Sequence, residues 1–518
     1  MIDSNYILYN QFYTLFYANY YFKKDYSSWS GTVSGAMKRI SPIIDKTPVE
    51  RVVEPRLGSD LSYRSGLWPW QQATLNCLLA GLGLSTIMIP VATATVFSGI
   101  LFAAFSILIF WRLILIFMGV LLRCLCRARA AKHRRDDDLP IYSILVPAYQ
   151  EAEIMPQLAQ ALRGLEWPHH KLDIQLLVEA DDPETIEAAR ASNFPFGTRI
   201  MLVPTGGPRT KPNALNYGLA RARGVFVTVY DAEDIPHPAQ LAAAHARFRD
   251  ADETVVCLQA PLIADNAQTS WLASQWNLEY AVQFGLLLPS LSLYQMPLLI
   301  GGTSNHFRKE TLLALGGWDA WNVTEDADLG MRIARAGLRS EVIAAPTYEE
   351  APISLNTWLH QRSRWIKGFM QTWLVLMRTP RRTLKQMGGP AFFAMQASLG
   401  GAILAPIFHA PFLLAIAVAG FWDPLEIGRY GMALLCAGLM ISLLSHIAAP
   451  GPWSWQRLVA VLTRPFYWPL LSFAAYRAIW ELASNPFFWA KTTHHPRKTD
   501  ADRQCSTGLL ALASPSPS

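Results

Sequence analysis

The sequence predicts a mostly parallel α/β domain placed between two blocks of apolar helices. Short apolar runs alternate with helical stretches between residues 138 and 350, which is the pattern of a parallel sheet covered by helices. Long, nearly uncharged stretches precede and follow this region. Of the 518 residues, 51% are hydrophobic and only 16% are charged, a balance too apolar for a wholly soluble protein. We therefore expect a multi-pass membrane protein with an inserted soluble domain.

The N-terminal part divides into two segments. Residues 1–70 are rich in aromatic side chains, and the sequence assigns them no function. Residues 71–123 have room for two membrane-spanning helices, because one crossing needs about 20 apolar residues and Arg112 is the only charge between 74 and 122. Pro90 marks the predicted hairpin. Basic residues flank both ends and place them in the cytoplasm: Arg51, Arg56 and Arg64 before, and Arg123, Arg127, Arg129, Lys132, Arg134 and Arg135 after.

The soluble domain, 138–350, contains four predicted strands and at least two helices. The strands cover 141–146, 174–178, 200–203 and 225–230, and the helices begin near Glu151 and cover 211–223. Ligands of such sheets bind beyond the carboxyl ends of the strands. Polar side chains follow two of these ends: Glu179, Asp181 and Asp182 after the second strand, and Asp231 and Glu233 after the fourth. The sequence therefore predicts a binding site at this edge.

The region after this domain is expected to be helical and in contact with the membrane. Residues 351–385 form a predicted amphipathic segment at the membrane interface, with Trp358, Trp365, Phe369 and Trp373. Residues 386–483 hold three apolar blocks, near 391–420, 429–450 and 457–482. Because an even number of crossings returns the chain to the cytoplasm, we expect one block to be interfacial or re-entrant, with 391–420 the first candidate. Residues 484–518 are a predicted cytosolic tail, partly disordered.

Charge and cysteine content exclude some classes of function. The net charge is +6, and much of the positive excess lies beside the apolar blocks. This placement indicates contact with a lipid bilayer and argues against nucleic-acid binding. The six cysteines show no CxxC spacing, so neither a zinc site nor a disulfide framework is indicated.

Carboxylates after the strands suggest a site for a diphosphate and a cation. Asp231 and Glu233 suit a divalent ion that neutralises a diphosphate, although an exposed acidic turn would have the same pattern. Asp181 and Asp182 suit hydrogen bonds to a uracil ring or a ribose, and Asp182 equally suits a helix cap before Pro183.

Two motifs in the second half of the domain suggest where a reaction takes place. Lys211 opens a predicted helix, where a lysine suits phosphate binding or is simply solvated. Thr324, Glu325 and Asp326 also precede a helix, so capping is one reading. The other is catalytic: Asp326 accepts the proton of an attacking hydroxyl in a one-step displacement that inverts the anomeric carbon.

The run Gln361-Arg362-Ser363-Arg364-Trp365 places three different side chains on one helix face. Positions 361, 364 and 365 share that face. An amide hydrogen-bonds sugar hydroxyls, a guanidinium stabilises a departing diphosphate, and an indole stacks on a sugar ring. The same residues would also suit a helix at a membrane interface, with Trp365 at the headgroup level and the Arg364 side chain extending to the water.

These motifs, in this order, resemble glycosyltransferase family 2 in its processive, membrane-integrated branch, which includes the cellulose, curdlan, chitin and hyaluronan synthases. Residues 146–151 resemble the family's P-x-Y-N-E turn, with Gln150 in place of the usual Asn. Residues 211–216 are similar to the K-x-x-x-L-N segment, 301–305 to the loop near the acceptor, and 489–492 to a short C-terminal segment. One departure is Glu233, because the family has Asp in its DxD motif.

The resemblance implies a GT-A (Rossmann-like) fold and inverting, metal-assisted transfer from a UDP-sugar to a growing β-linked polysaccharide. It implies Mg²⁺ or Mn²⁺ as the cofactor and a polysaccharide as the acceptor. Export partners are compatible with the resemblance, which does not identify them. The implied roles are catalysis by Asp326, Glu325 and Arg364, nucleotide-sugar binding by Tyr149, Glu151, Glu179, Asp181, Asp182, Lys211 and Asp231, acceptor binding by Gln361, Trp365, Thr324 and Gly302, and metal binding by Asp231 and Glu233.

Two other functions stay open at this point. One is a transferase that adds a single sugar to a lipid-linked acceptor, although the QxxRW motif accompanies chain extension in the family. The other is a catalytically inactive transport or scaffold subunit. In each case we expect a bacterial-type inner (plasma) membrane protein with its soluble domain in the cytoplasm.

Overall fold

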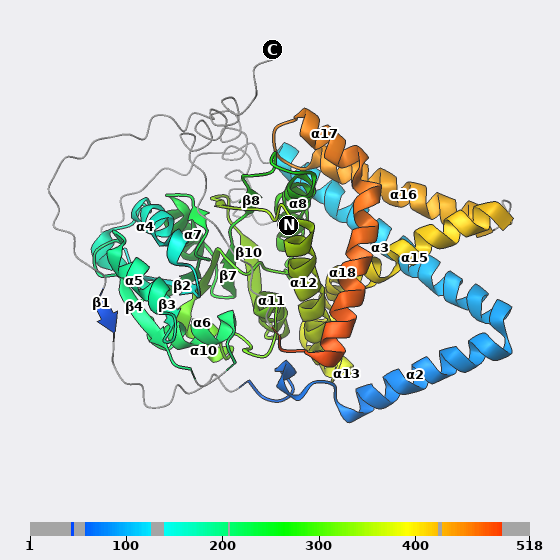
Figure 1. Ribbon diagram of the computed structural model, residues 1–518, viewed down its shortest axis with the longest axis horizontal. Coiled ribbons are helices and arrows are strands. Elements are labelled where there is room, and N and C mark those ends of the chain that lie inside the picture. The colour runs from blue at the N-terminus through cyan, green and yellow to red at the C-terminus, as the bar shows by residue number, and fades with distance from the viewer. Residues whose placement is uncertain (1–42, 46–56, 126–138, 206–207, 423–426, 489–518) are drawn as a thin grey trace, which may run out of the picture.

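The computed structural model describes residues 43–45, 57–125, 139–205, 208–422 and 427–488 (Figure 1). Several expectations fall outside these residues: the aromatic part of 1–70, most of the basic residues that flank the first apolar helices, the segment 489–492 and the tail that follows it. In the described part, an α/β domain lies on one side, and long apolar helices extend away from it on the other (Figure 1).

An eight-stranded mixed sheet forms the centre of the α/β domain. Its order is β1-β4-β3-β2-β5-β9-β7-β10, and every pairing is parallel except those of β9. The strands are β1 (Ile43–Asp45), β2 (Tyr142–Ala148), β3 (Leu172–Glu179), β4 (Arg199–Val203), β5 (Phe226–Val229), β7 (Val255–Gln259), β9 (Asn305–Arg308) and β10 (Arg339–Val342). A small sheet contains β6 (Ile235–Pro236), β11 (Thr347–Glu349) and β8 (Leu262–Ala264).

Helices cover both faces of the large sheet because its strands are apolar on both faces. In β2, Ile144 and Val146 belong to one apolar core, and Leu145 between them belongs to the other. The helices of this domain are α4 (Met155–Arg163), α5 (Pro183–Ala191), α6 (Lys211–Leu219), α7 (Gln240–Asp250), α8 (Trp271–Val282), α9 (Leu288–Leu293), α10 (Lys309–Ala314) and α11 (Glu325–Arg335).

The four predicted strands correspond to β2, β3, β4 and β5, with ends that differ by at most two residues. The predicted helix at 211–223 ends earlier, at Leu219, and the helix expected near Glu151 begins at Met155 after one 3-10 turn. The sequence pattern did not indicate the other four strands of this sheet: β1, β7, β10, and β9, which runs antiparallel between β5 and β7.

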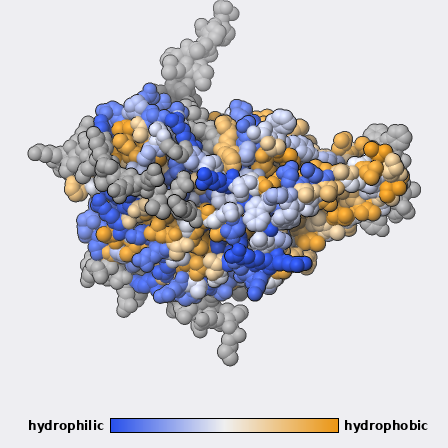
Figure 2. Space-filling model, turned by 90° about the horizontal axis from the view of Figure 1, so that it is seen from below, coloured by the Kyte–Doolittle hydropathy of each residue, from blue (hydrophilic) through white to orange (hydrophobic). Residues whose placement is uncertain are grey.

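Three helical stretches among the described residues are long and apolar enough to cross a membrane: Pro90–Cys124, Gly389–Ala415 and Gly431–Ala448. They belong to α3 (Pro90–Leu125), to α14 (Gly389–Met395) with α15 (Gly401–Trp422), and to α16 (Ile427–Ala448). Their exposed side chains form an apolar surface on the part of the molecule that projects from the α/β domain (Figure 2). α2 (Pro69–Met88) precedes α3 and breaks before Pro90, as predicted, but it is not among the three, so its crossing stays a prediction.

The third apolar block, not the first, contains the break. α17 (Trp455–Leu462) and α18 (Arg464–Ser484) meet at an angle of 62°, which makes them a broken span or a re-entrant loop. The first block instead continues from α14 through a π-turn into α15, and its Pro406 and Pro411 lie inside a continuous helix. Neither proline ends the helix, so the structure gives the first block no break of the kind seen in the third. Whether 391–420 is interfacial or re-entrant stays a prediction.

The helix that carries the QxxRW run packs inside the protein along much of its length. α12 (Leu355–Leu376) lies against α18 and α11, and α13 (Pro380–Met387) follows it. Trp358, predicted to face the membrane interface, is fully buried and donates its indole N–H to the Tyr467 hydroxyl over 2.9 Å. Gly368 lets α12 approach α11 closely, because a Cβ at this position would collide with the side chain of Thr324.

We predict that Gly368→Ala lowers the thermal unfolding temperature of the detergent-solubilised protein. The added methyl group forces α12 away from Thr324, and overpacking of this kind costs about 1–3 kcal/mol. Gly389→Ala is the matched control, since a Cβ there meets no atom within 4 Å, and we expect no measurable shift. Equal unfolding temperatures for both variants would contradict the close approach.

Candidate functional site

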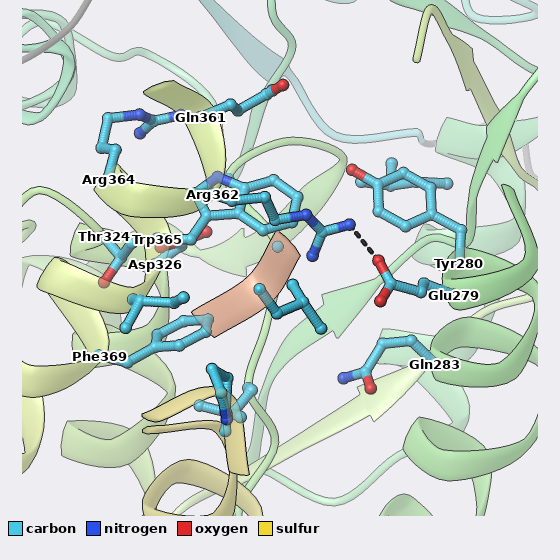
Figure 3. A pocket seen from close by; sticks show the side chains of 18 of the residues that line it. Glu279, Tyr280, Gln283, Thr324, Asp326, Gln361, Arg362, Arg364, Trp365 and Phe369 are labelled. Carbon is cyan, nitrogen blue, oxygen red and sulfur yellow. Dashed lines mark hydrogen bonds and ion pairs between the residues drawn. The ribbon is translucent and has the colours of Figure 1, made fainter. Parts of the chain in front are cut away.

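A single continuous cavity of about 1770 Å³ connects the sheet with the apolar helices. It begins beyond the carboxyl ends of β2, β3 and β5, passes α12, and continues between α3, α15 and α16. Figure 3 shows its middle section, where side chains of α8, α11 and α12 face one another. The cavity therefore joins the predicted binding edge of the sheet to the membrane-facing part of the molecule.

Most of the predicted site residues line this cavity, although they come from many separate segments. They are Tyr149, Glu151, Glu179, Lys211, Asp231, Glu233, Gly302, Thr324, Glu325, Asp326, Gln361, Arg364 and Trp365. Asp181 and Asp182 are not among the lining residues. Asp181 is exposed and forms an ion pair with Arg209 over 2.6 Å, and Arg209 itself lines the cavity.

Asp182 is buried and serves two structural roles. One carboxylate oxygen accepts a hydrogen bond from the Thr185 N–H and caps α5. This is the capping role that the sequence offered as the alternative to nucleotide binding. The other carboxylate oxygen accepts from the Gln150 N–H over 2.5 Å. Gln150 has a φ of +53°, a left-handed conformation in which Asn is favoured among side-chain-bearing residues. Asp182 thus holds the turn that presents Tyr149 and Glu151 to the cavity.

Lys211 lies among acidic groups at the centre of the sheet edge. Its ammonium group forms an ion pair with Asp231 and donates a 2.8 Å hydrogen bond to the carbonyl of Gly302. A Cβ on Gly302 would lie 3.5 Å from the Lys211 Nζ and 3.3 Å from the Asp326 Oδ2. Burial alone lowers the pKa of Lys211, but Asp231 and Glu325 outweigh this effect and raise it, so the ammonium stays charged.

Three carboxylates crowd together after β5. Asp234 accepts hydrogen bonds from the Asp231 N–H and the Thr303 hydroxyl, and so ties the strand end to the loop before β9. Burial, together with the charge of Asp231, raises the pKa of Glu233 to about 8 and that of Asp234 well above its usual value. Carboxylate oxygens are the ligands that a hard divalent cation takes in proteins. Asp231 already pairs with Lys211, and the described residues contain no group of three or more His, Cys, Asp or Glu side chains placed to hold a metal ion.

Glu325 and Asp326 begin α11 beside this group. Burial raises the pKa of Asp326, and burial together with the charge of Asp326 raises the pKa of Glu325 to about 8. Thr324 is the residue before the helix, but its side chain makes no capping hydrogen bond. The Asp326 Oδ1 accepts from the N–H of Ala327, while Oδ2 lies toward Gly302 and Lys211.

The predicted face of α12 points into the cavity, with one residue more than the sequence suggested (Figure 3). The Gln361 Oε1 is buried and makes no hydrogen bond with the described residues. Arg364 donates to the carbonyl of Val323 over 3.2 Å and interacts electrostatically with Glu325 and Asp326. The Trp365 ring lies 4.8 Å from that of Trp276.

Sequence reasoning missed an ionic cluster formed by Glu279, Arg362 and Arg464. Arg362 extends from α12 and pairs with Glu279, which also pairs with Arg464 over 2.5 Å (Figure 3). Burial alone raises the pKa of Glu279, but the two arginines outweigh it and lower that pKa. The Arg362 guanidinium also lies over the rings of Trp276 and Trp365, at 4.1 and 4.8 Å. The only available signal was Arg362 itself, in the middle of the QxxRW run.

Residues 140–368 match the family model described as "Glycosyltransferase like family 2". The probable glycosyltransferase YdaM of Bacillus subtilis is 26% identical over 45% of this chain and 56% of its own length. The beta-monoglucosyldiacylglycerol synthase of Synechocystis is 24% identical over 70% of this chain and 76% of its own. The cellulose synthase catalytic subunit of Komagataeibacter sucrofermentans is 26% identical over 46% of this chain and 32% of its own.

Residues 140–368 are therefore similar to glycosyltransferases of family 2, and these similarities support a glycosyltransferase. The chain spans little more than half of YdaM and a third of the cellulose synthase subunit. Among solved structures, a mannosyltransferase from Pyrobaculum calidifontis in complex with GDP-Man and Mn²⁺ gives a TM-score of 0.49 at 20% identity, over 74% of this chain and 99% of that one. The central mixed sheet and the match of residues 140–368 to the family model indicate a GT-A-like fold.

We predict that Glu279→Gln destabilises the protein, because it leaves Arg362 and Arg464 in the cavity without a counter-charge. Removing one partner of a buried ion pair costs 3–5 kcal/mol, and the partial exposure of Glu279 reduces our expectation to about 2 kcal/mol. Thermal unfolding measures the change. Glu187→Gln removes one partner of an exposed pair with Arg190 and should shift the curve by no more than about 0.5 kcal/mol. A Glu279→Gln variant as stable as this control would refute the role of the cluster.

Proposed function

We propose that the protein transfers a hexose from a nucleotide diphosphate sugar to a hydroxyl group of an acceptor held at the membrane end of the cavity. The observation that carries this proposal is the meeting, in one cavity, of the Lys211–Asp231 group at the strand ends with Asp326 and Arg364. We propose UDP as the nucleotide, and a bacterial-type inner membrane as the location, with several crossings and a cytoplasmic domain.

Donor binding is assigned to the edge of the sheet. Tyr149, Glu151 and Glu179 lie where a base and a ribose would be received, and Asp181 with Arg209 flanks this position. Asp182 is assigned an indirect part, since it holds the Tyr149–Glu151 turn. Lys211 suits the diphosphate, because it is a buried ammonium group at the start of a helix.

The carboxylates after β5 fit a divalent cation, Mg²⁺ or Mn²⁺. Asp231 and Glu233 would hold it, because both line the cavity and carboxylate oxygens suit such an ion. Burial, and after it the charge of Asp231, raises the pKa of Glu233, and a bound cation would favour the ionised form of this side chain. When bound, such an ion supplies positive charge to the departing diphosphate. A replacement of DxD by DxE keeps the oxygen ligands that this role needs.

The chemical step is assigned to Asp326. Its carboxylate accepts the proton of the acceptor hydroxyl while that oxygen attacks the anomeric carbon, and the bond from this carbon to the diphosphate oxygen breaks. Arg364 stabilises the charge that develops on the leaving diphosphate. Glu325 is coupled to Asp326, because burial and the Asp326 charge raise the pKa of Glu325 to about 8. Near neutral pH the proton therefore stays on Glu325, and Asp326 is the carboxylate that acts as the base. One attack with one base gives inversion.

The acceptor occupies the cavity on the α12 side. Trp365 suits stacking on a sugar ring, and the unpartnered Oε1 of Gln361 suits a sugar hydroxyl. Thr324 and Gly302 line the same stretch. A growing β-linked polysaccharide is the acceptor that the QxxRW run favours. A single lipid is the second candidate, since the beta-monoglucosyldiacylglycerol synthase is similar to 70% of this chain.

The test of this function uses membranes that contain the protein, radiolabelled UDP-sugars, and Mg²⁺ or Mn²⁺. We predict transfer from one sugar donor, and a loss of about 10²- to 10⁴-fold in Asp326→Asn with UDP binding retained, since general-base catalysis contributes this much. Label in material of high mass indicates a polymer, and label in a lipid extract indicates single addition. Equal transfer by wild type and Asp326→Asn would remove Asp326 from the mechanism.

We also predict a pH profile that depends on Arg364. A base must be deprotonated, so the raised pKa of Asp326, caused by burial, places the acid limb of kcat/KM above the ordinary aspartate value of about 3.9. Arg364→Gln removes a positive charge that lowers the pKa of Asp326, so the acid limb moves to higher pH. The profile is measured at saturating metal. An unchanged or lower limb in Arg364→Gln would contradict the electrostatic contact between Arg364 and Asp326.

A further inference from the structure

Arg112 is a charged residue inside an apolar helix, and the proposed reaction does not use it. It lies on α3, three residues before Leu115, whose carbonyl accepts a hydrogen bond from Ser290 of the α/β domain. It therefore lies about 4.5 Å along the helix from this contact. Arg112 lines the cavity, and its Nε is buried without a hydrogen bond to any described residue. An ionisable group at such a position is costly unless it has a binding function.

Two histidines accompany Arg112 at this end of the cavity. His446 on α16 is fully buried, and its Nε2 makes no hydrogen bond within the described part of the chain. His409 on α15 stacks on Trp468, with ring centres 5.5 Å apart, and its Nδ1 is likewise without a partner there. Both residues line the cavity and lie within electrostatic range of Arg112 and Arg464. Three helices thus direct polar groups into one section of an otherwise apolar region.

The charges that line the cavity are divided between its two ends. The sheet end has an excess of carboxylates, eight against three cations. The carboxylates are Glu151, Glu179, Asp231, Glu233, Glu325, Asp326, Glu349 and Glu350, and the cations are Arg209, Lys211 and Arg364. The membrane end has three arginines, Arg112, Arg362 and Arg464, against the single carboxylate of Glu279, which already pairs with two of them. A divalent cation and a diphosphate suit the acidic end. The basic end suits a different anion.

Beyond Arg112 the lining becomes apolar. Phe105 lies two helical turns farther along α3, about 10 Å away by the helical rise, and stacks on Phe412 with ring centres 5.8 Å apart. Leu413 and Leu434 continue this lining. From the sheet outward, the cavity therefore offers a reaction centre, a sugar-stacking tryptophan, a basic section and a hydrocarbon-lined section.

We propose that the acceptor is a lipid phosphate, whose phosphate accepts hydrogen bonds from Arg112 and from the Nδ1–H of His409 and whose hydrocarbon chain lies along Phe105 and Phe412. The Nδ1 of His446 donates to the Ser442 carbonyl, so His446 lines the phosphate position without donating to it. The hydroxyl-bearing head of the lipid then points past Trp365 toward Asp326. This inference rests on the proposed function and names its acceptor class; it applies to a single addition and equally to a chain that grows on the lipid. A neutral acceptor would leave the excess positive charge uncompensated, whereas a phosphate forms charge-assisted hydrogen bonds with a guanidinium.

The test measures lipid binding by the full-length protein in neutral detergent. The probes are dihexadecyl phosphate and the neutral dihexadecylglycerol, which share their alkyl chains. We expect wild type to bind the phosphate about 10 to 100 times more tightly, the worth of a charge-assisted hydrogen bond. Arg112→Gln should lose this preference, and Arg112→Lys should keep part of it. Arg381→Gln, which removes an exposed arginine of α13, should keep all of it.

UDP binding with Mn²⁺, measured on every variant, separates the two proposals. Retained UDP binding in Arg112→Gln shows that the donor end is intact. If this variant loses UDP binding, the lipid preference is compared between Arg112→Lys and wild type instead. Failure of wild type to bind UDP counts against the proposed function and not against the lipid site. Equal affinity of wild type for both lipids, a preference that survives Arg112→Gln, or one lost in Arg381→Gln overturns the lipid-phosphate site. Displacement of the lipid by millimolar inorganic phosphate would show that the site binds free phosphate, and would contradict the proposal that the phosphate belongs to a lipid.

Discussion

The position of α12 depends on burying a lysine and a glutamine on the face opposite the cavity. Lys367 is fully buried, and its ammonium group binds the Glu481 carboxylate at 3.1 Å and the Phe488 carbonyl at 2.9 Å. Gln371, one turn later, accepts from the Val323 N–H and donates to the Pro486 carbonyl. A buried charge without these partners would be very costly, so α12 cannot slide or rotate against α11 and α18. The orientation of the QxxRW run follows from this constraint.

The same helix connects two regions of opposite charge. On the α11 side it presents Arg364 to the carboxylates of Glu325 and Asp326, and on the α8 side it presents Arg362 to Glu279. Neighbouring arginines of one helix thus serve different partners. Lys211 has a similar place within the sheet edge, because its ion pair with Asp231 and its bond to Gly302 connect α6 to two loops. Electrostatic attraction between distant segments therefore shapes the cavity as much as apolar packing does.

The sequence predicted the sheet better than it predicted the cavity. Strands such as β2 and β3 are short apolar runs that end in polar residues, and their carboxyl ends meet at one edge in any parallel sheet. That rule brought Glu179, Lys211 and Asp231 together without knowledge of the fold. It did not separate a binding role from a capping role for Asp182, because both need a carboxylate at the same position. Glu279 has no local motif at all, and its importance comes from partners 83 and 185 residues away. The bend between α17 and α18 likewise depends on tertiary packing.

α3 is much longer than a bilayer is thick. Its 36 residues extend about 54 Å, whereas the hydrocarbon core of a membrane measures about 30 Å. Its last turns are fixed to the α/β domain, since Gly119 lies against the backbone of Leu286 and Ser290 binds the carbonyl of Leu115. A rod anchored in this way answers a thinner or thicker bilayer by tilting about its fixed end. Because α3 forms one wall of the cavity, any tilt of this helix in a bilayer would change the shape of that wall.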